Sequence, residues 1–227
     1  MNERVLGNDF WYKTLPVLSI GMVLWVVTTL ILGSSLSYGI SGITLTVAII
    51  AVVLYVVFWL LAIFLAIYRK NILSMMFFFT ASFFSGVISS SLIAFASTIF
   101  RLELVLGIFL AAFFSGLGVT IGLLILGLWQ KDRITEKWIY PLIVFGLLLV
   151  IIEFSLILIF GYNPYILITS ILVLIWIFGV IIWDGSRLPS TIEEGYWMLA
   201  VVDIFLDMFN AIIRIFIILI EILSEME

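Results

Sequence analysis

Residues 196–223 read YWMLAVVDIFLDMFNAIIRIFIILIEIL. The run exceeds the roughly 20 apolar residues that span a bilayer, yet it contains ionisable side chains. At 100° per residue, its polar and charged positions fall within a helical stripe about 60° wide. The stripe comprises Tyr196, Asp203, Asp207, Asn210, Arg214 and Glu221. Because a face exposed to lipid would not carry such a stripe, we expect this helix to turn it toward the interior of a bundle.

The rest of the chain is apolar to a degree that fits a membrane protein. Of the 227 residues, 65% are hydrophobic and 11% are charged, whereas soluble domains are roughly 45–50% apolar. Apolar runs bounded by charges or turn residues predict six further spans. These are 15–33, 42–68, 72–99, 104–129, 138–160 and 164–183. The sequence therefore predicts an all-α integral membrane protein, with residues 1–227 forming a single seven-helix transmembrane domain in a lipid bilayer.

The connections between these spans are short, and their basic residues predict an orientation. They include a Gly161–Asn163 turn ahead of Pro164 and a loop at Asp184–Gly195. With the N-terminus inside, eight basic residues fall on the inner side and one, Arg101, on the outer side. The inner eight are Arg4, Lys13, Arg69, Lys70, Lys131, Arg133, Lys137 and Arg187. This bias predicts a multi-pass protein with a cytoplasmic N-terminus and a C-terminus on the opposite side, in the plasma membrane if the source is prokaryotic.

Several classes of function are disfavoured by the residues that the chain lacks. It has no Cys and no His, which removes thiolate and imidazole nucleophiles, disulfides and His-ligated metals or haem. An intramembrane aspartyl protease would carry a glycine-x-glycine-aspartate motif, which precedes neither Asp203 nor Asp207. A net charge of -4 argues against a nucleic-acid partner. We expect no enzyme activity and no cofactor.

Five ionisable residues within or beside the apolar runs are candidates for function, since charge in hydrocarbon costs about 2.5–3.5 kcal/mol. Glu153 is interpreted as a supporting partner or a protonated hydrogen-bond donor. Asp184 is either functional or part of an ordinary helix-exit turn, and Asp203 either lines a pathway or lies solvated at its inner mouth. Arg214 either lines the same pathway or neutralises Asp207 from two turns away.

Four short stretches resemble those of the transmembrane Bax inhibitor motif family, which comprises Bax inhibitor-1-like membrane proteins. Ile181–Asp184 resembles the family's tyrosine-aspartate ending of the sixth span, with Trp183 in place of tyrosine. Asp203–Asn210 resembles its final-helix signature, leucine-tyrosine-leucine-aspartate-x-x-asparagine. Phe79-Thr80 with Ser85-Gly86, and Lys131-Asp132, agree as well. The resemblance covers about two thirds of the chain, in the family's order.

The resemblance implies a fold in which six helices surround a central C-terminal helix. It implies a pH-sensitive calcium leak channel whose gate is a proton-sharing pair, here Asp184 and Asp207, with transient calcium contact. Arg69 would be the basic partner of the pair, and Asn210 belongs to the same signature. Two carboxyls in contact cannot both ionise cheaply, so we expect them to hold one proton and to separate when it leaves. Calcium would then be the transported ion, since hard cations prefer oxygen ligands.

A second interpretation is a membrane scaffold that regulates other membrane proteins, whose identity the sequence does not give, without intrinsic transport. The channel interpretation also faces a difficulty of depth. Asp184 is predicted at the inner mouth, whereas Asp207 lies about 11 residues into its span, or some 16 Å at 1.5 Å per residue. The two can meet only if the seventh helix begins above the membrane surface.

Overall fold

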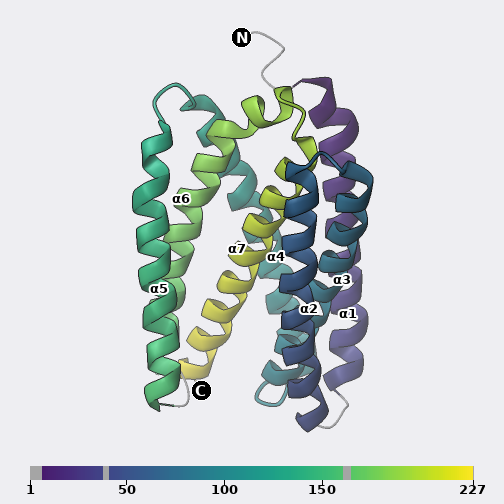
Figure 1. The fold of residues 1–227 in the computed structure, drawn as a ribbon. Coiled ribbons are helices and arrows are strands. Elements are labelled where there is room, and N and C mark those ends of the chain that lie inside the picture. Colours follow the sequence, from purple (N-terminus) through teal and green to yellow (C-terminus); the bar gives the residue numbers. More distant parts are fainter. Residues whose placement is uncertain (1–6, 38–40, 161–164, 227) are drawn as a thin grey trace. The chain divides into compact units, whose positions relative to one another are not determined.

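The computed structural model describes residues 7–37, 41–160 and 165–226, without the side chains of residues 37, 41–45, 136 and 157. Within these ranges the chain forms helices joined by turns, with no strand. Figure 1 shows the seven α-helices. They are α1 Leu15–Ser37, α2 Ser41–Ile67, α3 Asn71–Ala96, α4 Leu102–Trp129, α5 Ile139–Phe160, α6 Ile166–Glu193 and α7 Trp197–Met226. A π-helical turn, η1 Phe10–Thr14, precedes α1, and a 3₁₀ turn, η2 Glu136–Trp138, precedes α5.

Six of these helices, α1 to α6, are long and apolar enough to cross a membrane. The predicted all-α class and the multi-pass character of the chain are therefore confirmed. Helix α7 has 30 residues, which is long enough to span, but its charged stripe sets it apart from the other six. That α7 crosses the bilayer and lies at the centre of the bundle stays a prediction.

The end of α6 differs from the sequence-based expectation. A loop was expected from Asp184 onward, but α6 continues to Glu193 with Pro189 inside it. Proline removes the hydrogen bond that its own N–H would donate, and its ring crowds the carbonyl group four residues earlier, so it kinks or breaks a helix. Here the helix continues past it to Glu193. The chain reverses at Gly195, whose φ of 85° belongs to the left-handed region that glycine adopts without strain. The expected turn at residues 161–164 lies outside the described residues.

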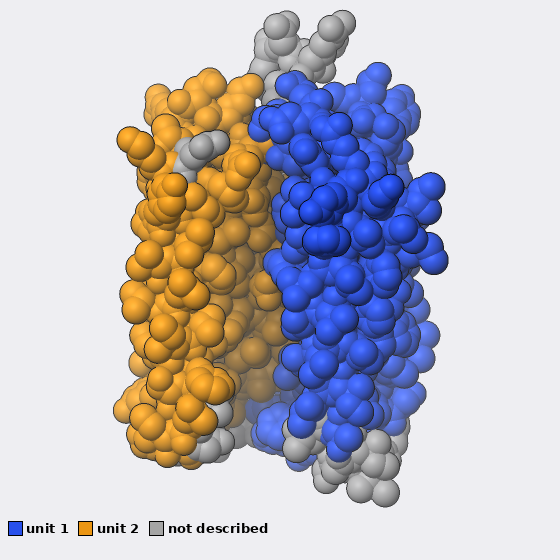
Figure 2. Space-filling view, viewed as in Figure 1, with its two compact units in different colours: residues 1–109, 188–206 blue, residues 110–187, 207–227 orange. Residues whose placement is uncertain are grey.

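The chain divides into two compact units, which Figure 2 shows in blue and orange. Unit 1 comprises residues 1–109 and 188–206, and unit 2 comprises residues 110–187 and 207–227. Helices α4, α6 and α7 each contribute residues to both units. Residues 166–187 of α6 and 207–226 of α7 belong to unit 2. The turn that joins these two helices belongs to unit 1.

Unit 1 is packed through small residues on α3 that allow close approach to α1. The indole of Trp25 is fully buried, and its Nε1 donates a hydrogen bond of 2.9 Å to the Ser89 hydroxyl. Gly86 lies against Thr28 and the backbone of Trp25, where a Cβ would come within 2.5 Å of the threonine side chain. Such contacts fix the register of α1 on α3, since any larger residue would separate the helices.

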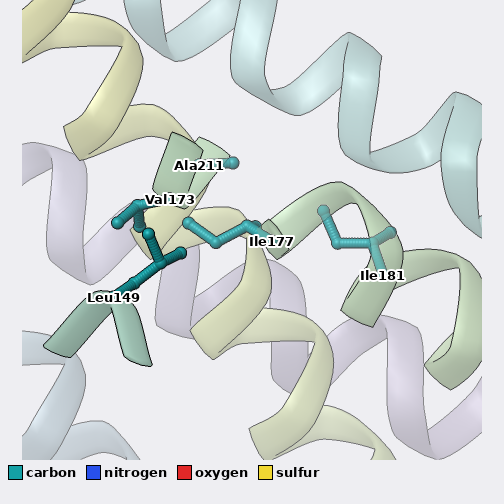
Figure 3. Packing of buried hydrophobic residues seen from close by; sticks show 5 residues of the cluster. All are labelled: Leu149, Val173, Ile177, Ile181 and Ala211. Carbon is teal, nitrogen blue, oxygen red and sulfur yellow. The ribbon is translucent and has the colours of Figure 1, made fainter. Parts of the chain in front are cut away.

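Unit 2 has its own apolar core, formed by α5, α6 and α7. Figure 3 shows the cluster of Leu149, Val173, Ile177, Ile181 and Ala211, all of which are buried. The members on α6 recur every four residues and so lie on one face of that helix. This core places one face of α6 toward α7. The candidate site takes residues from both helices.

Candidate functional site

The α6–α7 hairpin brings the two signature aspartates to matching depths. Asp184 lies nine residues before the end of α6 at Glu193, and Asp207 lies ten residues after the start of α7 at Trp197. Each is therefore about 14–15 Å along its own helix from the connecting turn. Asp184 therefore lies inside α6, about as far along its helix from the turn as Asp207 lies along α7.

A side-chain hydrogen bond joins Asp184 and Asp207 within unit 2. Asp207 is buried, with 5% of its surface exposed, and Asp184 is partly buried. An ionised carboxylate only accepts hydrogen bonds, so one of the two carboxyls must carry a proton and donate. The arrangement is therefore a carboxyl pair in side-chain contact, and its sharing of one proton stays a prediction.

The positive charge that acts on Asp184 within unit 2 is Arg187, one turn further along α6. The guanidinium of Arg187 lies over the Trp183 ring, 4.5 Å from the ring centroid. Arginine stays charged across the accessible pH range. Arg187 is thus a constant positive charge beside the pair, while the pair itself holds the titratable proton.

Helix α4 approaches α6 closely beside this site, through two glycines. A Cβ on Gly185 would lie 2.6 Å from the carbonyl oxygen of Leu124, and a Cβ on Gly127 would meet the carbonyl oxygen of Ile182. Both obstacles are backbone atoms, which no rotamer change can move. The missing side chains therefore let α4 pack directly against the segment of α6 that carries Asp184.

A second polar contact in unit 2 joins α5, α6 and α7. Arg214 donates through Nη1 to Glu153 Oε1 at 2.8 Å and through Nη2 to Glu153 Oε2 at 2.9 Å. Its Nη1 also lies 3.4 Å from the hydroxyl of Ser170 on α6. The two-pronged ion pair of Arg214 is thus with Glu153 on α5, and the interpretation in which Arg214 neutralises Asp207 stays a prediction. Glu153 is a partner of Arg214.

The other predicted residues lie elsewhere. Arg69, in unit 1, donates a hydrogen bond of 2.8 Å to the carbonyl oxygen of Glu194 and lies 4.8 Å from the centroid of the Tyr196 ring. These contacts tie Arg69 to the α6–α7 turn, and its role as basic partner of the aspartates stays a prediction. Asp203 in unit 1 and Asn210 in unit 2 are partly buried on α7.

The family follows from a comparison with protein-family models. The model described as inhibitor of apoptosis-promoting Bax1 matches residues 7–224. The chain belongs to this family. No curated protein and no solved structure matches it. The family assignment thus confirms the resemblance and agrees with a multi-pass membrane protein that carries the Bax inhibitor motif.

Sequence reasoning missed some residues of this Bax inhibitor family protein that the structure gathers around its polar contacts. Ser170 and its neighbour Thr169 are hydroxyl residues in an apolar run, and only the packing of α5, α6 and α7 places Ser170 by Arg214. Gly127 could have been noticed as a small residue, but small residues are common in membrane helices. Arg187 had a local signal, since it stands three residues after Asp184 on the same helix. Among the described residues, no cluster of three or more Asp, Glu, His or Cys could hold a metal ion.

Proposed function

We propose that this Bax inhibitor family protein is a pH-sensitive cation leak channel that passes calcium and is gated by the Asp184–Asp207 pair. The observation that carries the proposal is the hydrogen bond between two carboxyls on adjacent helices inside an apolar bundle. A buried carboxyl pair is costly in hydrocarbon and serves packing poorly, which favours a functional role. Calcium is the transported ion, and the protein needs neither a cofactor nor covalent chemistry.

The gate works through the shared proton. While one carboxyl is protonated, the hydrogen bond holds α6 against α7. When the proton leaves, two like charges about 4 Å apart repel by roughly 4 kcal/mol at an effective dielectric constant of 20. That repulsion is enough to separate two packed helices locally, and the exposed carboxylate oxygens are the ligands that calcium prefers. Acid therefore closes the channel and alkali opens it.

Arg187 is a charged group of unit 2 that acts on this pair through Asp184. Its guanidinium attracts the Asp184 carboxylate without titrating. Helix α4 packs beside Asp184 through Leu124 and Gly127, which carry no ionisable side chain. We attribute the pH dependence of opening to the two aspartates.

The proposal is tested with the purified protein in liposomes that contain a calcium-sensitive dye, over a series of pH values. We expect calcium influx that rises with pH and is suppressed by acid. Asp207→Asn removes the shared proton and should make the influx independent of pH. Glu225→Gln, at the exposed end of the same helix, is the control and should keep the wild-type pH profile.

Two results would overturn the proposal. Influx indistinguishable from that of empty vesicles at every pH would favour the scaffold that regulates other membrane proteins. A wild-type pH profile in Asp207→Asn would remove the aspartate pair as the gate, even if the protein conducts calcium.

A further inference from the structure

Thr120 on α4 carries a buried hydroxyl that its own helix does not satisfy. The residue is 0% exposed, and among the described residues no group forms a hydrogen bond with its Oγ1. Thr29 on α1 is equally buried, but its hydroxyl donates a hydrogen bond of 2.8 Å to the carbonyl oxygen of Trp25, four residues earlier. A hydroxyl withdrawn from water without a hydrogen bond costs free energy. Packing alone therefore does not explain the threonine at position 120.

Two close contacts of α4 enclose Thr120 within unit 2. At Gly116, one turn before Thr120, a Cβ would meet the side chain of Ile212 on α7 and lie 3.1 Å from its Cα. At Gly127, two turns after Thr120, a Cβ would meet the carbonyl oxygen of Ile182 on α6. The segment of α4 that carries Thr120 thus passes from α7 to α6.

The two aspartates lie along the same interval. Ile212 is fifteen residues after the start of α7, or about 22 Å from the α6–α7 turn. The contact at Gly127 reaches from Ile182 to Ser186 and so includes the level of Asp184, about 14–15 Å from that turn. Thr120 lies between these two levels, within about one helical turn of the carboxyl pair.

Thr120 also faces the two helices that carry the pair. At 100° per residue, Thr120 lies 40° and Gly127 lies 20° from Gly116 around the axis of α4. The two glycines mark the face of α4 that packs against α7 and α6. The hydroxyl of Thr120 therefore lies on this face, in the interior of unit 2.

A hydroxyl beside two carboxyls completes a set of ligands for a hard cation. Calcium takes oxygen ligands, several of them from carboxylates and the rest from neutral oxygens and water. A threonine hydroxyl offers two lone pairs for such a contact. Because the Thr120 hydroxyl makes no hydrogen bond to a described group, it is available to a cation without the loss of a bond within the protein.

We propose that Thr120 is the third protein ligand of a divalent-cation site that it forms with Asp184 and Asp207 when the hydrogen bond between the two carboxyls is broken. The inference rests on the proposed function and deepens it, because it adds α4 to the two helices that handle the cation. The unsatisfied hydroxyl is then a cost in stability that the closed state carries for the sake of transport.

The transport test measures calcium influx into liposomes at alkaline pH over a series of calcium concentrations. Thr120→Val replaces the hydroxyl by a methyl group of similar size, and it should raise the half-saturating calcium concentration by about threefold to tenfold, the range that one such contact contributes. The conservative variant Thr120→Ser keeps the hydroxyl and should recover most of the affinity. Thr29→Val in unit 1 is the matched control for loss of a buried threonine hydroxyl and should keep the wild-type value.

Thermal unfolding in detergent provides a measurement that does not depend on transport. Without calcium, Thr120→Val should unfold at a higher temperature than the wild type, since an unsatisfied buried hydroxyl is removed. Thr29→Val loses a hydrogen bond and should show no such gain. At alkaline pH, calcium chloride should raise the unfolding temperature of the wild type more than that of Thr120→Val, with sodium chloride at matched ionic strength as the reference.

The outcomes separate this inference from the proposed function. An equal half-saturating calcium concentration in Thr120→Val and the wild type would overturn the inference while the channel stands, and so would a lower unfolding temperature in Thr120→Val. Wild-type vesicles without influx would reject the channel. The calcium-dependent shift in unfolding temperature then decides on the site, and a shift that is absent or equal in the wild type and Thr120→Val would reject it. If Thr120→Val does not fold, Thr120→Ala removes the same hydroxyl and should show the same loss of calcium affinity.

Discussion

Substitution of Gly127 by alanine tests whether close packing of α4 on α6 supports the candidate site. A Cβ at this position would meet the carbonyl oxygen of Ile182 and lie 2.9 Å from the amide nitrogen of Ser186 and 3.0 Å from the Cα of Gly185. These are backbone atoms, so relief requires the two helices to move apart. Overpacking of this kind costs about 1–3 kcal/mol.

The same helix provides a matched control. A Cβ on Gly122 meets no atom within 4 Å, so Gly122→Ala gains the helix propensity of alanine, about 1 kcal/mol, without a clash. Gly127→Ala gains the same propensity and pays the steric cost in addition. We therefore expect Gly122→Ala to be neutral or more stable than the wild type, and Gly127→Ala to unfold more easily than Gly122→Ala by about 1–3 kcal/mol.

The assay is reversible unfolding in mixed micelles of a mild detergent and dodecyl sulfate, followed by circular dichroism. When the same variants are reconstituted into liposomes, calcium influx should respond to pH less steeply in Gly127→Ala, since displacement of α6 weakens the Asp184–Asp207 contact. Equal stability of Gly127→Ala and Gly122→Ala would refute the close approach of α4 to α6 and the support it gives to the site.

Three further predictions concern individual contacts. Ser89→Ala removes the hydroxyl that accepts the hydrogen bond of the Trp25 indole and should lower the free energy of unfolding by about 1–3 kcal/mol. The control is Ser90→Ala, which removes a hydroxyl that bonds within α3 and should lower the free energy of unfolding by less. Equal losses in the two variants would contradict the Trp25–Ser89 contact. Gly195→Ala forces a side chain into a φ of 85° and should cost roughly 1–2 kcal/mol in the same unfolding assay; a neutral effect would refute that turn. Trp176→Phe loses a bond of 2.8 Å to a carbonyl of α5 and should cost about 0.5–1.5 kcal/mol, with an unchanged free energy as the contrary result.

The polar stripe of α7 could be predicted from the sequence because the periodicity of a helix depends only on the spacing of residues along the chain. Asp207 and Arg214 share a face in any α-helix, whatever surrounds it. The partners of that face were not predictable, since they depend on which helices pack against it. Glu153 lies 61 positions before Arg214 in the chain, so the sequence left its role undecided. For the same reason, Arg214 was interpreted as a possible partner of Asp207.

The extent of α6 shows a different kind of failure. Asp184-Gly185 is a pair of residues that commonly ends helices, and it led to the prediction of a loop from Asp184 onward. Tertiary packing prevailed over this local preference, since Gly185 serves the close approach of α6 to α4. The helix then continues past Pro189 to Glu193. Because the predicted helix ended too early, Asp184 was placed at its end, whereas it lies nine residues before the end of α6 at Glu193.

The central claim, that Asp184 and Asp207 share one proton that controls calcium influx, is tested most directly by infrared spectroscopy of the reconstituted protein during a pH titration. The account predicts a band from a protonated carboxyl that disappears over the same pH interval in which calcium influx rises, and that is lost in both Asp184→Asn and Asp207→Asn. A protonated-carboxyl band that persists unchanged in both variants, or influx that rises while the wild-type band stays constant, would contradict it.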